Sequence, residues 1–155
     1  MNIDKLLLLR EELAGLDKAA AHLAASLARS GGLIGRDALS DEEMERLESL
    51  TSRFARVADL LVQRVMRLVD ELELLPPGTL LDRLNRAEKR GWIDRAAQWR
   101  RIREVRNMIA HEYADDKLAE IYAEVFALAP QLLAAVPKVG AYAENLVRQL
   151  EADAS

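Results

Sequence analysis

Several residue types that carry chemistry are scarce or missing in this chain of 155 residues. There is no cysteine, which excludes disulfide frameworks, thiolate nucleophiles and cysteine-ligated zinc. The two histidines, His22 and His111, lie far apart in the sequence, so a histidine-rich metal site within one chain is not expected. We therefore expect neither a metal nor a cofactor.

Long hydrophobic runs are also missing. The longest stretch without a charged residue covers residues 125–137, whereas a membrane-spanning helix needs roughly 20 apolar residues. Four leucines follow one another near the amino terminus, but no basic region precedes them, so they do not resemble a signal peptide. These absences predict a cytoplasmic protein with no membrane segment.

Patterns typical of β-strands are nearly absent, and helical periodicity replaces them. The length suits a single domain over residues 1–155. We predict an all-α fold, an antiparallel bundle of four to six helices with one long central helix. The expected helices cover residues 3–29, 40–75, 79–90 and 93–113, then a segment from 115 that Pro130 kinks, and a last stretch that Pro137 opens.

The predicted central helix has a clear start and a continuous apolar face. Ser40 and Glu43 have the spacing of a capping box, in which each side chain bonds the backbone N–H of the other residue. The apolar stripe that follows has spacings of three and four residues, and it consists of Leu47, Leu50, Phe54, Val57, Leu61, Val65, Leu68 and Leu72. The segment Pro76-Pro77-Gly78 should end this helix.

Positive charge is concentrated in one quarter of the chain, although the net charge is −4. Residues 83–106 contain nine basic side chains against three acidic ones: Arg83, Arg86, Lys89, Arg90, Arg95, Arg100, Arg101, Arg103 and Arg106. Such asymmetry is typical of a site for phosphate, RNA or an acidic partner. A solvated helix face with incidental charge explains it equally well.

The segment that ends this basic run contains an arginine in an unusual place. On a helical wheel Trp99, Ile102, Ile109 and Tyr113 form one apolar stripe, and Arg106 lies within it. A guanidinium stays charged, so burying it without a partner is costly. Its position therefore indicates either a buried ion pair or a cleft that opens to a ligand or a second chain.

A polar strip lies beside the apolar one and consists of Arg100, Arg103, Asn107 and His111. Arginine forks bind phosphate oxygens in bidentate fashion, and histidine can give and take a proton near pH 7. RNA supplies its own nucleophile through the 2′-hydroxyl, so this strip can serve RNA cleavage without a metal. Arg106 and His111 stand about 140° apart on the wheel, so they would meet on one phosphate more easily if two copies of the helix faced each other in a homodimer.

The octapeptide Arg106-Asn107-Met108-Ile109-Ala110-His111-Glu112-Tyr113 resembles the Arg-x4-His-x-Tyr signature of HepT-like toxins in the HEPN superfamily. The resemblance implies a metal-independent endoribonuclease that acts as a homodimer, with Arg106 and His111 catalytic and Asn107 as an accessory polar residue. It also implies a minimal nucleotidyltransferase as the cognate antitoxin, which would attach AMP to Tyr113. Arg100 and Arg103 are candidate contacts to RNA.

Other interpretations stay open. Some relatives in this superfamily resemble non-catalytic helical partners of a nucleotidyltransferase, and this chain could be one of them. His111 and Asn107 could be polar residues at a helix end, Tyr113 could be a core tyrosine, and the whole chain could be a plain helical scaffold.

Overall fold

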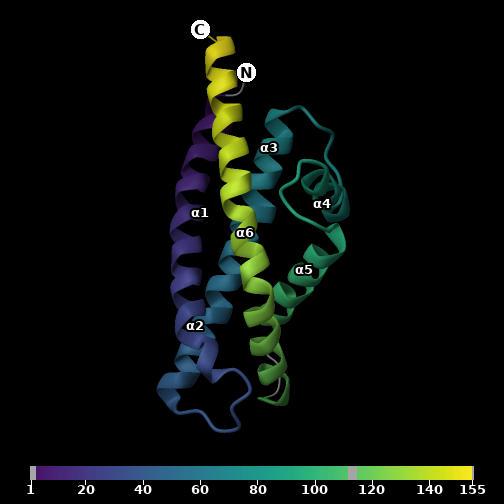
Figure 1. Cartoon of the computed structure of the whole chain (residues 1–155). Helices are drawn as coiled ribbons and strands as arrows, with labels where there is room; N and C mark the ends of the chain where they lie inside the picture. Colours follow the sequence, from purple (N-terminus) through teal and green to yellow (C-terminus); the bar gives the residue numbers. More distant parts are fainter. Residues whose placement is uncertain (1–2, 112–114, 155) are drawn as a thin grey trace.

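The computed structural model describes residues 3–111 and 115–154, and nearly all of them are helical (Figure 1). No strand occurs in these two ranges, so the predicted all-α class is confirmed. The helices are α1 (Ile3–Ser30), α2 (Asp41–Ala58), α3 (Met66–Leu72), α4 (Leu80–Lys89), α5 (Ala96–Ala110) and α6 (Asp115–Ala154), with a 3₁₀ turn η1 (Gly31–Leu33) and a π-helical segment η2 (Asp59–Val65).

Three long rods form the body of the bundle (Figure 1). α1 runs down one side, and the rod made of α2, η2 and α3 returns upward beside it. α6 also runs upward, so both chain ends lie at the same end of the molecule. α4 and α5 lie on one side of these rods, where α4 packs against α3 and α5 packs against α2 and α6. The basic run of the sequence is therefore carried by two short helices. Both face the rod made of α2, η2 and α3, which is the central rod of the bundle.

The core follows the predicted apolar stripes. All eight residues of the stripe between Leu47 and Leu72 are buried, as are the two tryptophans, Trp92 and Trp99. α1 contributes Leu9, Leu16 and Leu23, among others, to the same core. Burial of these side chains supplies the main favourable free energy of folding, because it removes apolar surface from water.

The long central helix contains a feature that periodicity did not predict. The seven residues of η2 widen the rod to a π-helix between α2 and α3, while the backbone stays helical on both sides. Such segments are rare and occur frequently at functional sites. Asp59 is the first residue of this segment.

The predicted capping box at the start of α2 is confirmed. The Glu43 N–H donates to Ser40 Oγ at 3.1 Å, and the Ser40 N–H donates to Glu43 Oε1 at 3.0 Å. α4 begins with a second capping box, between Thr79 and Asp82, which was not predicted.

Three predicted helix boundaries were wrong. α5 begins at Ala96 instead of 93 and ends at Ala110, because Arg95 and His111 both have extended backbone angles. α6 is one helix of 40 residues that contains both Pro130 and Pro137, so Pro137 does not open a separate helix. Both prolines are exposed, so their rings point to solvent and packing along the other face of α6 continues past them.

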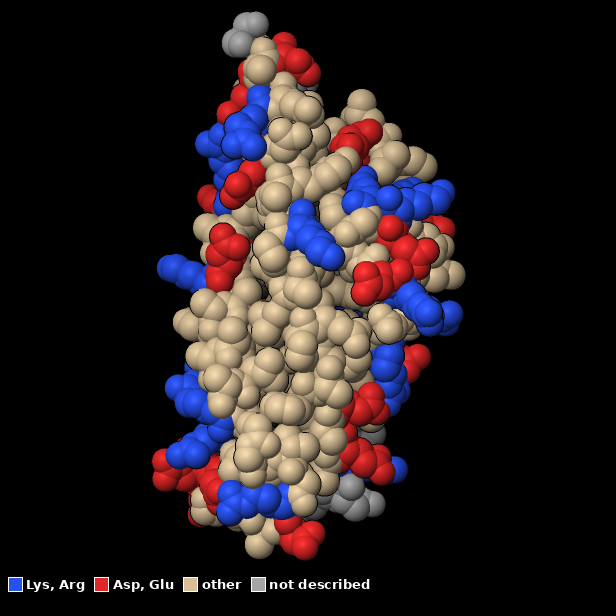
Figure 2. Space-filling view, viewed as in Figure 1, with Lys and Arg blue, Asp and Glu red and all other residues tan. Residues whose placement is uncertain are grey.

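α6 is long and apolar enough to qualify as a membrane span by length and composition, from Lys117 to Ala154. A core helix of a soluble bundle meets the same criteria. Its inner residues, including Val125, Leu132 and Val139, are buried against the rest of the bundle. Figure 2 shows that the outer surface along the middle of α6 is mostly uncharged, with basic and acidic side chains along its margins.

Candidate active site

The guanidinium of Arg106 is held by a carboxylate from another helix. Arg106 Nε donates to Asp59 Oδ1 at 2.7 Å, and Arg106 Nη2 donates to Asp59 Oδ2 at 2.8 Å. Arg106 comes from the last third of α5, and Asp59 opens the π-helical segment of the central rod. The two parallel bonds form the bidentate arrangement in which an arginine fork matches a carboxylate, so the plane of the guanidinium is fixed.

This pair lies at the edge of the core. The side chains are 28% exposed for Arg106 and 34% exposed for Asp59. Behind them Trp99, Ile102 and Val105 are fully buried on the inner face of α5. Of the two explanations for Arg106, the ion pair is therefore the one observed, but it is about one third exposed, so the guanidinium keeps a side open to solvent.

The charge balance at this pair is positive. Arg103 Nη1 lies 3.6 Å from Asp59 Oδ1, so two guanidiniums share one carboxylate. The hydrogen bonds from Arg106 to Asp59 raise the pKa of Arg106, which secures its charge at any relevant pH. Arginine has five N–H donors, and Asp59 accepts from two of those of Arg106. The remaining donors of Arg106, together with Arg103, can bind an anion.

His111 does not continue the polar strip of α5. Its backbone is extended (φ −100°, ψ 147°), so it forms the C-cap of the helix, and its N–H donates to Met108 O at 3.2 Å. The helical wheel consequently does not apply to His111, and the predicted strip of four residues was wrong at this end. The side chain is exposed at the point where the chain leaves α5.

The structure brings some of the other predicted site residues together and leaves others apart. Arg100 and Asn107 are exposed on α5, whereas Arg103 turns toward Asp59 beside Arg106. Tyr113, the predicted modification site, lies outside the described residues.

Five of the nine basic residues of the run form ion pairs with specific carboxylates that the structure describes, and two of these five are Arg103 and Arg106. Arg86 and Arg90 bind Asp70, and Arg101 forms ion pairs with Glu124 and Glu104. The asymmetry in the sequence therefore reflects ion pairs between helices as much as a site for an external anion.

Sequence reasoning missed Asp59, although the sequence contains a signal for it. Asp59 and Asp70 are the two acidic residues between positions 49 and 70, a stretch of apolar, small and basic residues. Each of them accepts an ion pair from two arginines of the basic run. Carboxylates of the long predicted helix are thus the partners of four arginines of the basic run.

These features define a class of protein: an all-α bundle whose α5 ends in an Arg-x4-His segment, with the arginine oriented by a carboxylate of the central rod. The model of the family described as Ribonuclease HepT-like matches residues 18–139. That range includes Asp59, Arg106 and His111 and covers most of the chain, and the protein belongs to this HEPN-type ribonuclease family. No curated protein and no solved structure matches the chain.

Proposed function

We propose that this protein is a metal-independent endoribonuclease of the toxin type, with Arg106 and His111 as its catalytic residues. The observation that carries the proposal is the arginine of the Arg-x4-His segment, which is fixed by Asp59 at the edge of the core with several donors left over. Membership of the HepT-like ribonuclease family supports the same reaction class.

The proposed reaction uses the RNA's own nucleophile. The 2′-oxygen attacks the adjacent phosphorus, the bond from phosphorus to the 5′-oxygen breaks, and the products end in a 2′,3′-cyclic phosphate and a 5′-hydroxyl. His111 would remove the 2′-hydroxyl proton or protonate the leaving 5′-oxygen, as an imidazole can near neutral pH. Arg106 would stabilise the negative charge on the phosphorane, and one such donor is worth about 3–4 kcal/mol.

Asp59 has a positioning role in this scheme. It binds the Nε–Nη2 edge of Arg106, so the Nη1 group is free to point at a phosphate. Because the guanidinium is already oriented, little side-chain entropy is lost when the substrate binds. Arg103 would keep the site cationic despite the carboxylate, and Arg100 and Asn107 would contact RNA from the exposed face of α5.

A nuclease assay with paired histidine variants tests this proposal. His111→Ala should abolish cleavage of RNA by the purified protein, while His22→Ala, which changes an exposed histidine on α1, should leave it intact. Arg106→Ala should abolish cleavage as well. Induced expression of the natural sequence should arrest growth, and His111→Ala should relieve the arrest. If natural and His111→Ala proteins are equally inert on RNA and equally harmless, the chain is a non-catalytic helical partner of a nucleotidyltransferase instead.

We propose further that the site is completed by a second copy of the chain. His111 lies beyond the end of α5, one turn or more from Arg106, so the two side chains need not serve the same phosphate from one chain. Mixing Arg106→Ala with His111→Ala tests this. If each site takes its arginine from one copy and its histidine from the other, mixed dimers regain one site, and activity should reach about a quarter of the natural level. No recovery after subunit exchange would place both residues of a site in one chain.

The proposed antitoxin is a minimal nucleotidyltransferase that attaches AMP to Tyr113. Co-expression with a neighbouring gene of that type, followed by intact-mass measurement, should reveal added AMP on the natural protein and none on Tyr113→Phe. Tyr122→Phe, which changes a buried tyrosine of α6, is the control and should still be modified.

A further inference from the structure

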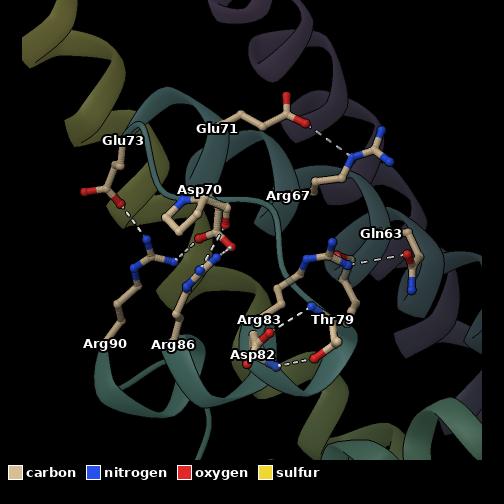
Figure 3. Close-up of polar contacts among 12 residues, drawn as sticks. Gln63, Arg67, Asp70, Glu71, Glu73, Thr79, Asp82, Arg83, Arg86 and Arg90 are labelled. Carbon is tan, nitrogen blue, oxygen red and sulfur yellow. Dashed lines mark hydrogen bonds and ion pairs between the residues drawn. The ribbon is translucent and has the colours of Figure 1, made fainter.

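A second cluster of cationic side chains lies at the opposite end of the basic run, between α3 and α4 (Figure 3). An open cavity of about 440 Å³ lies between the end of α3, the loop that follows it, the start of α4 and the first turns of α1. Its charged lining consists of Lys5, Arg67, Arg83, Arg86, Asp70 and Glu71. Four cations thus face two carboxylates.

Both carboxylates are already engaged. Asp70 binds Arg86 at 3.1 Å and Arg90 at 2.7 Å, and Glu71 binds Lys5 at 3.2 Å and Arg67 at 3.7 Å. Each carboxylate therefore serves two cations, and neither is left for the remaining guanidinium.

That guanidinium belongs to Arg83. It donates to Val62 O at 3.4 Å and to Gln63 Oε1 at 3.5 Å, both long contacts, and it forms no ion pair with any acidic residue that the structure describes. Burial lowers the pKa of Arg83, and the nearby Arg67 and Arg86 lower it further, against the effect of Asp70 and Glu71. Figure 3 shows Arg83, Arg86 and Arg90 rising side by side from α4 toward α3. Keeping the half-buried Arg83 guanidinium charged beside other guanidiniums costs free energy, and a bound anion would reduce that cost.

The rest of the cavity wall is mostly apolar, with Thr79 as its one polar side chain among the lining residues. Leu74, Leu75, Pro76 and Pro77 line it, and Leu74 is 89% exposed on a backbone with φ of +60°. A non-glycine residue with positive φ is strained, and an exposed leucine gains nothing from packing. The cavity is much larger than a phosphate ion and lies in the size range of small-molecule sites. It combines a surplus guanidinium with an apolar rim.

We propose that this cavity binds the phosphate monoester of a nucleotide, with the phosphate on Arg83 and the base against Leu74 and the two prolines. The ligand is either a free mononucleotide or the phosphorylated end of an RNA. The site is separate from Arg106 and His111 and does not depend on the proposed nuclease function.

Calorimetric titration with uridine 5′-monophosphate tests the site. The natural protein should bind it more tightly than inorganic phosphate and much more tightly than uridine. Arg83→Gln should weaken binding at least tenfold, whereas Arg56→Gln, an exposed arginine of α2 outside the cavity, should have no effect. Leu74→Ser should weaken binding of the nucleotide but not of inorganic phosphate.

Two further measurements decide the source of the phosphate and the cause of any loss. The first compares three ligands: the mononucleotide, a short RNA with a 5′-phosphate, and the same RNA with a 5′-hydroxyl. If the phosphorylated RNA binds at least tenfold more tightly than both others, the site recognises RNA ends. Otherwise the free nucleotide is the ligand. Arg83→Gln should keep the natural melting temperature, because no carboxylate loses its partner, and His111→Ala should keep nucleotide binding. Absence of binding at millimolar nucleotide, or equal binding by Arg83→Gln, overturns the proposal.

Discussion

At the scale of single residues, the pair of Asp59 and Arg106 connects two helices and also orients the proposed catalytic arginine. The Asp59 carboxylate adds one negative charge to the site, but Arg103 beside it makes the net charge of the three side chains positive. What the carboxylate contributes is orientation: it fixes a side chain that otherwise has several rotatable bonds. A positioning residue of this kind should affect turnover more than substrate binding.

Asp59→Asn provides the corresponding prediction. The asparagine keeps the size of the side chain, but its amide nitrogen cannot accept a hydrogen bond from Arg106, so the bidentate pair is lost. Loss of one charge-assisted bond, about 1.5–3 kcal/mol, corresponds to a decrease in kcat of about 10- to 100-fold. KM for RNA should stay the same or fall, because a negative charge is removed from an anion-binding site.

Steady-state kinetics on a defined RNA separate kcat from KM for this variant, and Asp59→Glu should restore part of the activity. Asp17→Asn on the exposed face of α1 is the matched control and should behave like the natural protein. An unchanged kcat for Asp59→Asn would mean that the ion pair serves only the fold.

At the scale of helices, the capping box of α2 makes part of the stability depend on pH. The pKa of Glu43 is lowered from its ordinary value of 4.5, mainly because its carboxylate accepts from the Ser40 N–H, with a further contribution from Arg36. A lowered pKa in the folded state means that this contribution is present above about pH 4.5 and is lost as the pH falls through the folded-state pKa.

Glu43→Ala should therefore melt at a lower temperature than the natural protein at pH 7, and the difference should shrink as the pH falls below about 4.5. Glu45→Ala, which removes an exposed carboxylate of the same helix, is the control for the change in net charge. Melting curves followed by circular dichroism across this pH range measure both variants. A constant difference between Glu43→Ala and natural protein would contradict the assignment.

The prolines of α6 lead to a second prediction about a helix. Pro137 lies inside an unbroken helix, where it removes one backbone hydrogen bond and its ring crowds the preceding turn. Because its side chain is exposed, Pro137→Ala should stabilise the protein, by about 1–3 kcal/mol from helix propensity. Urea unfolding measures the change, and Gln131→Ala on the same exposed face should stay within about 0.5 kcal/mol of the natural protein. A less stable Pro137→Ala would show that the proline sets a curvature that α6 needs.

At the scale of the whole molecule, periodicity predicted the class of fold and most of the core. The stripe between Leu47 and Leu72 is buried in full because helical spacing alone decides which side chains share a face. Periodicity did not predict the π-helical segment, since a widened turn keeps spacings of three and four in the stripe. It did not predict the end of α5 at Ala110 either, because no glycine or proline marks that position.

The candidate site was predictable only in part for a related reason. The residues of one helix can be placed on a wheel, so Arg103 and Arg106 were correctly assigned to neighbouring positions on α5. Asp59 is 47 residues away in the sequence, and its contact with Arg106 depends on how two helices pack. A sequence can suggest such a pair only if the carboxylates of each predicted helix are compared with the arginines that lie on the apolar faces of the others.

Asp70 binds two arginines, as Asp59 does, but its ion pairs hold helices of the fold together. It is buried in α3 and accepts from Arg86 and Arg90, so it ties α4 to the central rod. Arg90 also donates to Glu73, and the hydroxyl of Tyr142 in α6 donates to the same carboxylate. One network thus connects α3, α4 and α6.

Asp70→Asn should be strongly destabilising. The substitution removes the carboxylate that binds Arg86 and one of the two that bind Arg90, and breaking a buried ion pair from one side costs roughly 3–5 kcal/mol. Glu120→Gln, which removes the exposed ion pair with Lys117, should change stability by less than about 1 kcal/mol. Urea unfolding of both variants at neutral pH tests the contrast. If Asp70→Asn unfolds like the natural protein, packing of α4 against α3 must rest on Leu84 and Ala87, the buried apolar residues of α4, rather than on this network.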